Sequence, residues 1–292
     1  MLATHARVDL ARGSVLSGRW QLGECIGRGA SAVVFDACDL QTGGPAAVKV
    51  LVPTADADAE RFRREIGILR SLDHPAIVRH LDHGVVDGRP FIALERPALG
   101  SLGDVVATGA LAPARVVRLG TDLAGALAAT HRLDIVHRDI KPSNILLDAD
   151  GSPRLADFGV AQVAGAQRFT ATGWSVGTIA YLAPEQARGE GSRPASDVYA
   201  LGLVLLECLT GRRVFPGTGM PALLARLDAA APVPDTLPPR LRAVLAAMTT
   251  PDPDARPAAL AVADLLPLAL ATDDGTQPVP ALDAPTQPVR TL

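Results

Sequence analysis

The strongest constraint on the fold is a change of hydrophobic period part-way along the chain. From Arg19 to Leu94, short apolar runs alternate with polar residues and are separated by glycine-containing turns, which is typical of antiparallel strands. One helical pattern, at about 58–71, interrupts these runs. From about Leu99 onward the apolar residues recur at helical spacing. The pattern therefore predicts an α+β chain in which a small β-rich half precedes a larger α-rich half.

Proline and glycine mark several expected helix ends. Pro113 stands where a helix can begin, and a second long helix is expected from about Ser196 to just before Gly211, a natural C-terminal cap. We expect residues 1–17 to form a flexible N-terminal tail and residues 271–292 to form a disordered, proline-rich one. The second tail carries the sequence TQPV twice. These repeats are interpreted either as a phosphorylation or docking site for a phosphothreonine-binding partner or, as we favour, as a solvated linker.

Composition excludes several classes of protein. Of the 292 residues, 48% are hydrophobic and 20% are charged, which indicates a globular chain and not a disordered one. The formal net charge of −3 gives no reason to expect a nucleic-acid partner. Cys25, Cys38 and Cys208 lack the spacing of metal ligands and are interpreted as buried thiols in a reducing compartment. With no apolar leader and no run long enough to span a membrane, we expect a soluble, cytoplasmic protein.

One loop gathers almost every kind of polar side chain. The sequence VHRDIKPSN, residues 136–144, contains Asp139, Lys141 and Asn144 and is flanked by apolar runs. A solvent-exposed turn is the ordinary interpretation of such a cluster. We expect the flanking runs, RLDIVH and ILLD, to form two buried strands, and a loop in that position indicates chemistry. Further on, Asp157 lies in the sequence ADFG, and the sequence APE at 183–185 closes a segment rich in hydroxyl groups.

Two features of the β-rich half point to a phosphate ligand. The glycine-rich stretch 26–34 lies between two predicted strands, which argues against a dinucleotide-binding fold and leaves a phosphate-covering loop or a plain hairpin. Lys49 lies in an apolar strand, where a lysine costs desolvation free energy unless it is paired. Glu65 on the following helix is the favoured partner and Glu60 the rival, whereas an edge-strand lysine facing water is the alternative.

The order of these motifs resembles that of the eukaryotic-type (Hanks-type) Ser/Thr protein kinases, and most closely of the bacterial branch, over about 18–270. The resemblance implies a bilobal protein kinase fold of the α+β class. Its small antiparallel β-rich N-lobe, with one main helix, would occupy 18–97 including the hinge, and its larger α-helical C-lobe would occupy 98–270. The implied activity is transfer of the γ-phosphate of ATP to Ser/Thr hydroxyls of proteins, with autophosphorylation of the activation loop. An ATP-binding pseudokinase or regulatory scaffold and a small-molecule kinase are the alternatives.

The resemblance also implies roles for individual residues. Asp139 would accept the proton of the substrate hydroxyl, Lys141 would steady the γ-phosphate, and Lys49, oriented by Glu65, would hold the α- and β-phosphates. Asn144 and Asp157 would hold Mg²⁺, or Mn²⁺ in its place. The residues implied to bind the nucleotide are Ile26, Gly27, Arg28, Gly29, Ala30, Ser31, Ala32, Val33, Val34, Ala47, Lys49, Glu95 and Leu146.

Other residues match supporting positions of the family. His137 is expected to pack near Phe158 and not to act as a base. Asp197 would anchor the backbone of the loop that carries Asp139, and Arg256 would pair with Glu185. Arg138 would pair with a phosphorylated Thr170 or Thr172, and Thr178 would line the site of the substrate hydroxyl.

The sequence departs from the family pattern at two positions. Ala32 replaces the third glycine of the loop, and we expect nucleotide binding to survive this change. Pro97 stands in the hinge at the third residue after Leu94, where the family uses a backbone N–H to bind adenine. Because proline has no N–H, only the carbonyl of Glu95 would bind the adenine, and we expect binding to be weaker by about 0.5–1.5 kcal/mol.

Overall fold

The computed structural model describes residues 10–29, 32–51, 63, 66–158, 179–215, 227 and 230–270. The chain divides into two compact units with separate cores. Unit 1 lies mainly within residues 1–73 and 77–98, and unit 2 mainly within 74–76 and 99–292. The helix expected at about 58–71 is described at residues 63 and 66–71, which are helical. Glu65 and the C-terminal tail lie outside the described residues.

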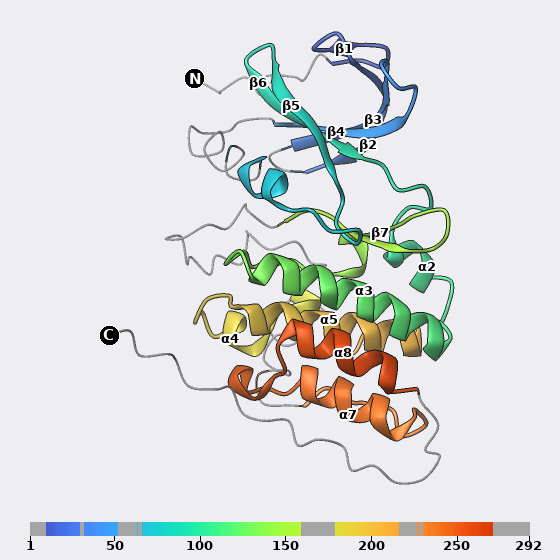
Figure 1. Ribbon diagram of the computed structural model, residues 1–292, viewed down its shortest axis with the longest axis vertical. Helices are drawn as coiled ribbons and strands as arrows, with labels where there is room; N and C mark the ends of the chain where they lie inside the picture. The colour runs from blue at the N-terminus through green and yellow to red at the C-terminus, as the bar shows by residue number, and fades with distance from the viewer. Residues whose placement is uncertain are drawn as a thin grey trace, which may run out of the picture. The chain divides into compact units, whose positions relative to one another are not determined.

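Unit 1 is built on one antiparallel sheet with the strand order β1-β2-β3-β4-β6-β5. The sheet is drawn in blue to cyan in Figure 1. It confirms the expected antiparallel, β-rich half, because each predicted apolar run carries a strand. The strands are β1 (Val15–Leu16), β2 (Trp20–Arg28), β3 (Ala32–Asp39), β4 (Pro45–Leu51), β5 (His80–Val86) and β6 (Arg89–Glu95).

The alternation of side chains gives this sheet two different faces. One face packs into a hydrophobic core that includes Trp20, Phe35, Val48 and Phe91. Their neighbours along the strands point the other way. Leu16 also belongs to this core and is 1% exposed. The expectation of a flexible tail as far as residue 17 is therefore wrong at its end, because β1 adds a short strand that buries Leu16.

Unit 2 is mainly helical, as the second half of the sequence predicts. Proline begins α3 at its first position, and Gly211 ends α5 with φ +66, the left-handed conformation of a glycine cap. In Figure 1, α3 lies beside α5 and α8. The helices are α2 (Leu102–Val106), α3 (Pro113–His131), α4 (Pro184–Ala187), α5 (Pro194–Thr210), α7 (Pro239–Met248) and α8 (Ala259–Leu268).

A small hairpin follows α3 and carries part of the site. Strands β7 (Ile145–Leu147) and β8 (Pro153–Leu155) pair antiparallel, and the short 3-10 helix η1 (Pro142–Asn144) precedes them. Two further 3-10 turns complete the unit, η3 (Ile179–Tyr181) and η4 (Pro253–Ala255). The polar loop therefore lies between helix α3 and the hairpin. The buried strand expected after the loop is confirmed as β7. The strand expected before it is wrong, because residues 132–137 form a turn and an irregular segment at the end of α3.

Two expectations from composition can be compared with the structure. Cys208 is buried, but Cys38 is half-buried and Cys25 is exposed. The interpretation of all three as buried thiols is therefore wrong for Cys25, which lies on the exposed part of β2. Within the part of the chain that the structure describes, no helix is both long enough and apolar enough to cross a membrane.

Candidate active site

The polar loop of unit 2 holds the Asp139 carboxylate by one of its two oxygens. Oδ2 accepts hydrogen bonds from Lys141 Nζ at 2.7 Å and from Asn144 Nδ2 at 2.9 Å. Oδ1 is buried and has no hydrogen-bond partner among the described residues. A buried polar atom without a partner costs free energy, so such an atom in a folded protein calls for an explanation. An absent donor, such as a hydroxyl group of a ligand, would supply the missing bond.

His137 orients the backbone of this loop and does not face a substrate. Its Nε2 lies 3.0 Å from the carbonyl oxygen of Ala156 and therefore donates to it, while Nδ1 accepts from the Asp139 N–H at 3.3 Å. Burial lowers the pKa of His137 and so favours the neutral ring that these two bonds require. The ring centroid lies 4.7 Å from that of Phe158. The expectation that His137 packs near Phe158 is confirmed.

Asp197, on the first turn of α5, anchors the backbone of the same loop. Its two carboxylate oxygens accept from the backbone N–H groups of His137 and Arg138, both at 2.8 Å. His131 Nε2 lies 2.9 Å from one of these oxygens, a contact that no motif in the sequence indicated. Arg138 has φ +72, an unusual backbone conformation for a non-glycine residue, and the two bonds to Asp197 hold the loop in it.

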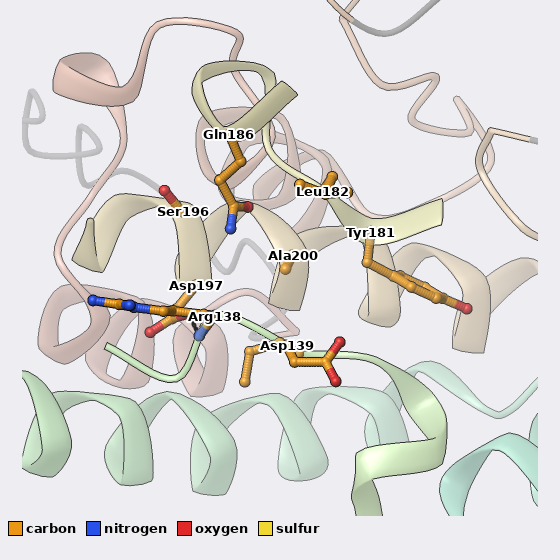
Figure 2. A pocket seen from close by; sticks show the side chains of 9 residues that line it. Arg138, Asp139, Tyr181, Leu182, Gln186, Ser196, Asp197 and Ala200 are labelled. Carbon is orange, nitrogen blue, oxygen red and sulfur yellow. Dashed lines mark hydrogen bonds between the residues drawn. The ribbon is translucent and has the colours of Figure 1, made fainter. Parts of the chain in front are cut away.

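The loop and helix α5 border a small open pocket. Figure 2 shows that the side chains of Arg138 and Asp139 point in opposite directions from the loop, with Asp197 between the loop and its helix. Tyr181, Leu182 and Gln186 line the pocket from the other side. The carboxylate of Asp139 therefore lies beside a recess formed by the segment around the APE sequence.

Asn144 and Asp157 are positioned by the hairpin that follows. The amide nitrogen of Asn144 donates to the carbonyl and to Oδ2 of Asp139, both at 2.9 Å. Because the nitrogen is used in this way, the oxygen of the same carboxamide is the atom of Asn144 that could bind a metal ion. The N–H of Ala156 donates to the backbone carbonyl of Asn144 at 2.8 Å, which joins the two segments, and Asp157 follows with φ +53. An amide oxygen and a carboxylate are ligands that suit a hard divalent cation.

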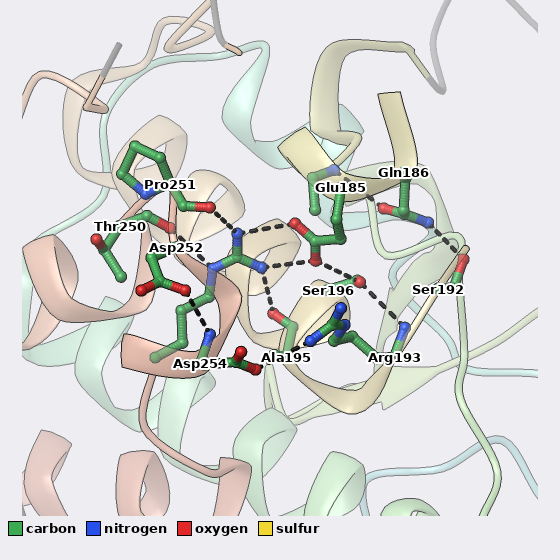
Figure 3. Close-up of polar contacts among 12 residues, drawn as sticks. Glu185, Gln186, Ser192, Arg193, Ala195, Ser196, Thr250, Pro251, Asp252 and Asp254 are labelled. Carbon is green, nitrogen blue, oxygen red and sulfur yellow. Dashed lines mark hydrogen bonds and ion pairs between the residues drawn. The ribbon is translucent and has the colours of Figure 1, made fainter. Parts of the chain in front are cut away.

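A buried ion pair fixes the segment that contains Glu185. The guanidinium of Arg256 binds Glu185 through two parallel bonds of 2.8 and 2.9 Å, and both side chains are fully buried. Figure 3 shows the surrounding network, in which Ser196 donates to the same carboxylate. Burial opposes ionisation of Glu185, but the bonds from Arg256 and Ser196 leave its pKa below the ordinary value. The pairing that the sequence predicted is confirmed.

Tyr181 and Glu207 form a second contact that the sequence did not indicate. The Tyr181 hydroxyl donates to Glu207 Oε2 at 2.5 Å. Burial and the neighbouring carboxylate raise the pKa of Tyr181 well above its usual range. The bond joins the segment around the APE sequence to α5 and so helps to shape the recess beside Asp139.

In unit 1, the second face of the sheet carries the residues implied to bind a nucleotide. Lys49 lies opposite Val34 on β3 and opposite Ile92 on β6, and Ala47 lies opposite Leu94. Residues directly opposite in an antiparallel pair share a face. Lys49 therefore shares this face with apolar neighbours, and it is half-buried.

The glycine-rich stretch joins β2 to β3, as predicted. The Gly29 N–H donates to the Ala32 carbonyl at 2.9 Å, which closes the turn, whereas Ala30 and Ser31 lie outside the described residues. Val33 is 5% exposed and points into the hydrophobic core. Strand alternation turns this side chain away from the Lys49 face, and the place of Val33 in a nucleotide site stays a prediction.

The segment after β6 contains the unusual proline. Pro97 is buried, and the Glu95 N–H donates to the Arg79 carbonyl at 2.9 Å. Arg96 forms an ion pair of 2.8 Å with Asp36 on β3. The sequence analysis missed this pair, since only the strand register brings the two residues together.

Several predicted residues lie outside the described part of the chain. They are Glu60, Glu65, Thr170, Thr172 and Thr178. Leu146 is described: it lies on β7, half-buried, between the buried Ile145 and Leu147. It also forms an isolated bridge with Ser101.

Comparison with known proteins finds similarity to protein kinases over most of the chain. Residues 20–265 match the model of the protein kinase domain. The serine/threonine-protein kinases PknL and PknA of Mycobacterium tuberculosis are 35% and 36% identical to this chain, over 84% and 80% of its length. The serine/threonine-protein kinase PrkC of Bacillus subtilis is 41% identical over 70% of the chain.

These relatives are longer proteins, of which the chain spans 64%, 57% and 32% respectively. The match nevertheless includes residues of both units and the motifs from the glycine-rich stretch to Arg256. The chain therefore belongs to the protein kinase family, in the bacterial branch of its Hanks-type Ser/Thr members.

Proposed function

We propose that the chain is a Ser/Thr protein kinase that transfers the γ-phosphoryl group of ATP to hydroxyl groups of proteins. The observation that carries this proposal is the hydrogen bonding of the two carboxylate oxygens of Asp139. One oxygen is fixed by Lys141 and Asn144, while the other is buried without a partner among the described residues. A substrate hydroxyl that donates to this oxygen would be oriented toward the phosphorus atom.

The surrounding charges suit phosphoryl transfer. The transition state spreads negative charge over the equatorial oxygens of the phosphoryl group, so cations close to it lower the barrier. Lys141 brings an ammonium to within 2.7 Å of the Asp139 carboxylate. Membership of the protein kinase family implies ATP and a divalent metal in general, and we propose Mg²⁺, held by Asn144 and Asp157, to neutralise the phosphates. Mn²⁺ offers the same coordination.

In unit 1, the face that carries Val34, Ala47 and Lys49 suits the nucleotide itself. Small apolar side chains can cover the purine, and the ammonium of Lys49 can bind the phosphates. The proposal includes orientation of Lys49 by Glu65 and the carbonyl of Glu95 as the adenine partner. Protein substrates and a cytoplasmic location, where ATP is available, belong to the same proposal.

The test is intact-mass analysis after incubation with Mg²⁺ and ATP. We expect the wild-type chain to gain phosphate, and we expect Asp139→Asn to slow this gain by about 10²–10⁴-fold, the usual contribution of a positioned general base. Fragment mapping should place phosphate between Asp157 and Glu185, where autophosphorylation would engage Arg138. Asp150→Asn is the matched control, because the side-chain hydrogen bonds of this exposed residue, within the described part of the chain, go to Ser152 in the same turn.

Equal phosphate gain in the wild type and in Asp139→Asn would remove Asp139 from the proposed role. No gain in the wild type, together with tight binding of ATP measured by calorimetry, would favour the ATP-binding pseudokinase or scaffold. Truncation after Leu270 tests the tail: a loss of phosphate would favour the TQPV repeats as modification sites and as docking sites for a phosphothreonine-binding partner.

A further inference from the structure

One histidine of unit 1 lies in surroundings that favour its neutral form. His80 is on β5, the strand at the edge of the sheet, and its side chain is half-buried. The Nε2 atom is buried and has no hydrogen-bond partner among the described residues. A ring nitrogen without a partner costs less in a neutral imidazole than in a protonated one, which carries a charge and two N–H donors. The position of His80 therefore opposes protonation.

A β-bulge brings a second imidazole to the same side of the sheet. His80 lies opposite Leu94 and His83 lies opposite Ile92, so three steps along β5 correspond to two steps along β6. In a regular strand, residues three apart point to opposite faces. Here the two histidine rings lie on one face with their centroids 5.2 Å apart. A proton on either ring therefore repels a proton on the other.

The groups around His80 come from two elements. Burial is the largest cause of the lowered pKa of His80, and the neighbouring His83 lowers it further. The Asp82 carboxylate on the same strand acts in the opposite direction, and the Arg70 guanidinium, from the helical segment 66–71, again lowers the pKa. Charged groups of the strand and of the helical segment thus both bear on this one ring.

His80 shares a face of the sheet with Lys49. The register places His80 opposite Leu94 on β6, and Leu94 opposite Ala47, which is two residues before Lys49 on β4. Directly opposite residues share a face, and so do residues two apart on one strand. A movement that brings His80 to water therefore affects the face to which the proposed function assigns the nucleotide.

The helical segment 66–71 forms the other part of these surroundings. Leu69 in this segment is 6% exposed, and the charge of the next residue, Arg70, acts on His80. The segment directly follows Glu65, to which the proposed function gives an orienting role. A protonated His80 regains its solvation when the ring moves out toward water. Protonation therefore favours a state in which the segment packs less closely on the sheet.

We propose that His80 makes this kinase reversibly sensitive to acid, because protonation of its ring opens the packing of the segment 66–71 and slows phosphoryl transfer. This inference rests on the proposed function. A ring exposed to water takes up its proton at about pH 6.5, whereas the packed ring takes it up at a lower pH. The packed state is therefore favoured above about pH 6.5 and weakens as the pH falls below that value. Since one proton is involved, the equilibrium shifts by at most about tenfold per pH unit.

The experiment compares the rate of phosphate gain, followed by intact mass with Mg²⁺ and ATP, in neutral and in acidic buffer. His80→Phe keeps an aromatic ring and removes the titrating group. We expect the fall in rate between about pH 7.5 and about pH 5.5 to be at least about threefold smaller in His80→Phe than in the wild type. Groups that titrate in both proteins cancel in this comparison. An equal fall in both proteins would overturn the inference and leave the proposed function standing.

Leu81→Met is the matched control. Leu81 is the next residue on β5 and packs against the hydrophobic core, and its replacement changes no titrating group. This variant should keep the pH response of the wild type. His83→Gln should reduce the response in part, because it removes only one of the groups that oppose the charge on His80. Far-UV circular dichroism checks that each variant is folded, and His80→Gln is a second neutral variant if His80→Phe is not.

Hydrogen–deuterium exchange separates this inference from the proposed function, because it requires no phosphoryl transfer. After correction for the intrinsic pH dependence of exchange, the protection of the segment 66–71 should fall by up to about tenfold per pH unit below about pH 6.5 in the wild type. It should stay nearly constant in His80→Phe. Unchanged protection in the wild type would overturn the inference. No phosphate gain at either pH, together with this loss of protection, would overturn the proposed function and leave the opening controlled by His80 standing.

Discussion

At the scale of single residues, three carboxylates of unit 2 differ in how their oxygens are occupied. Both oxygens of Asp197 accept backbone N–H groups, and both oxygens of Glu185 accept from Arg256. Asp139 keeps one buried oxygen without a partner among the described residues. A fully bonded carboxylate holds a structure in place, whereas one with an open position can bind a ligand. The hydrogen-bond partners of a carboxylate, and not the residue type, therefore distinguish a structural carboxylate from one that can bind a ligand.

The buried pair between Glu185 and Arg256 supports a stability prediction. We expect Arg256→Met to lower the free energy of unfolding of unit 2 by about 3–5 kcal/mol, because it leaves the Glu185 carboxylate buried without its partner. The double variant Arg256→Met with Glu185→Leu should lose less, since no charge is then left unpaired. Urea unfolding followed by far-UV circular dichroism measures both.

Asp254→Asn serves as the control for that experiment. Asp254 forms an ion pair with Arg193 in the same unit, but its side chain is 79% exposed. Exposed pairs contribute at most about 1 kcal/mol, so this variant should unfold close to the wild type. A larger loss in Asp254→Asn than in Arg256→Met would contradict the argument from burial.

The sequence predicted a contact between two residues where both belong to recognisable motifs. It did not predict contacts that arise only from the register of the sheet. Arg256 and Glu185 were paired in advance through the kinase resemblance. Asp36 and Arg96 were not paired in advance. Asp36 lies on β3 and Arg96 directly follows β6, with β4 between these two strands, so no local pattern connects the two positions. The left-handed backbone of Arg138 was equally hidden, since it follows from hydrogen bonds made by Asp197 on a distant helix.

At the scale of elements, hydrophobic period was a reliable guide to the strands and the long helices. Helices α3 and α5 begin or end at the proline and glycine that the sequence marked. Strand β7 was expected from the apolar run after the polar loop, but β8 was not, because three residues are too few to show a period. Helix α5 is buried along most of its length, and close packing of this kind depends on residue size.

Gly202 on α5 shows this dependence and supports a prediction. A Cβ atom at this position would lie 2.6 Å from Thr249 Cγ2 and 3.1 Å from Met248 Cβ, at the end of α7. Alanine favours a helix over glycine by about 1 kcal/mol, but overpacking a buried contact costs about 1–3 kcal/mol. The difference is a net loss, and we expect Gly202→Ala to lower the free energy of unfolding by up to about 2 kcal/mol in a urea titration.

Gly125→Ala on α3 is the matched control. Its Cβ would lie 3.4 Å from the nearest described atom, His74 Nε2, which is an ordinary contact. This variant should therefore be neutral or gain up to about 1 kcal/mol from helix propensity. If both variants gained stability, packing around α5 would be looser than the contacts of Gly202 indicate.

At the scale of the whole molecule, the two units have separate cores, and each carries a carboxylate with a lowered pKa. A hydrogen bond from Arg19 holds the pKa of Asp39 in unit 1 well below its usual range, and Glu185 in unit 2 also has a lowered pKa. A lowered pKa stabilises the fold at any pH above the unfolded value, about 4. That stability is lost as the pH falls through the folded value, so both units should weaken in acid.

Separate probes can follow the acid response of each unit. Trp20 lies in the core of unit 1 and is 0% exposed, so its fluorescence reports that unit once Trp174 is replaced by phenylalanine. Far-UV circular dichroism reports mainly the helices of unit 2. In urea titrations from neutral pH downward, we expect Asp39→Asn to reduce the pH dependence of the Trp20 transition, because the titrating carboxyl is gone.

The same substitution should leave the pH dependence of the helical transition unchanged, since Asp39 and its partner Arg19 both belong to unit 1. An altered helical transition would show instead that the two units unfold as one cooperative structure. An unchanged Trp20 transition would mean that the bond between Arg19 and Asp39 does not couple folding to protonation. The experiment therefore tests both the origin of the acid sensitivity and the independence of the two cores.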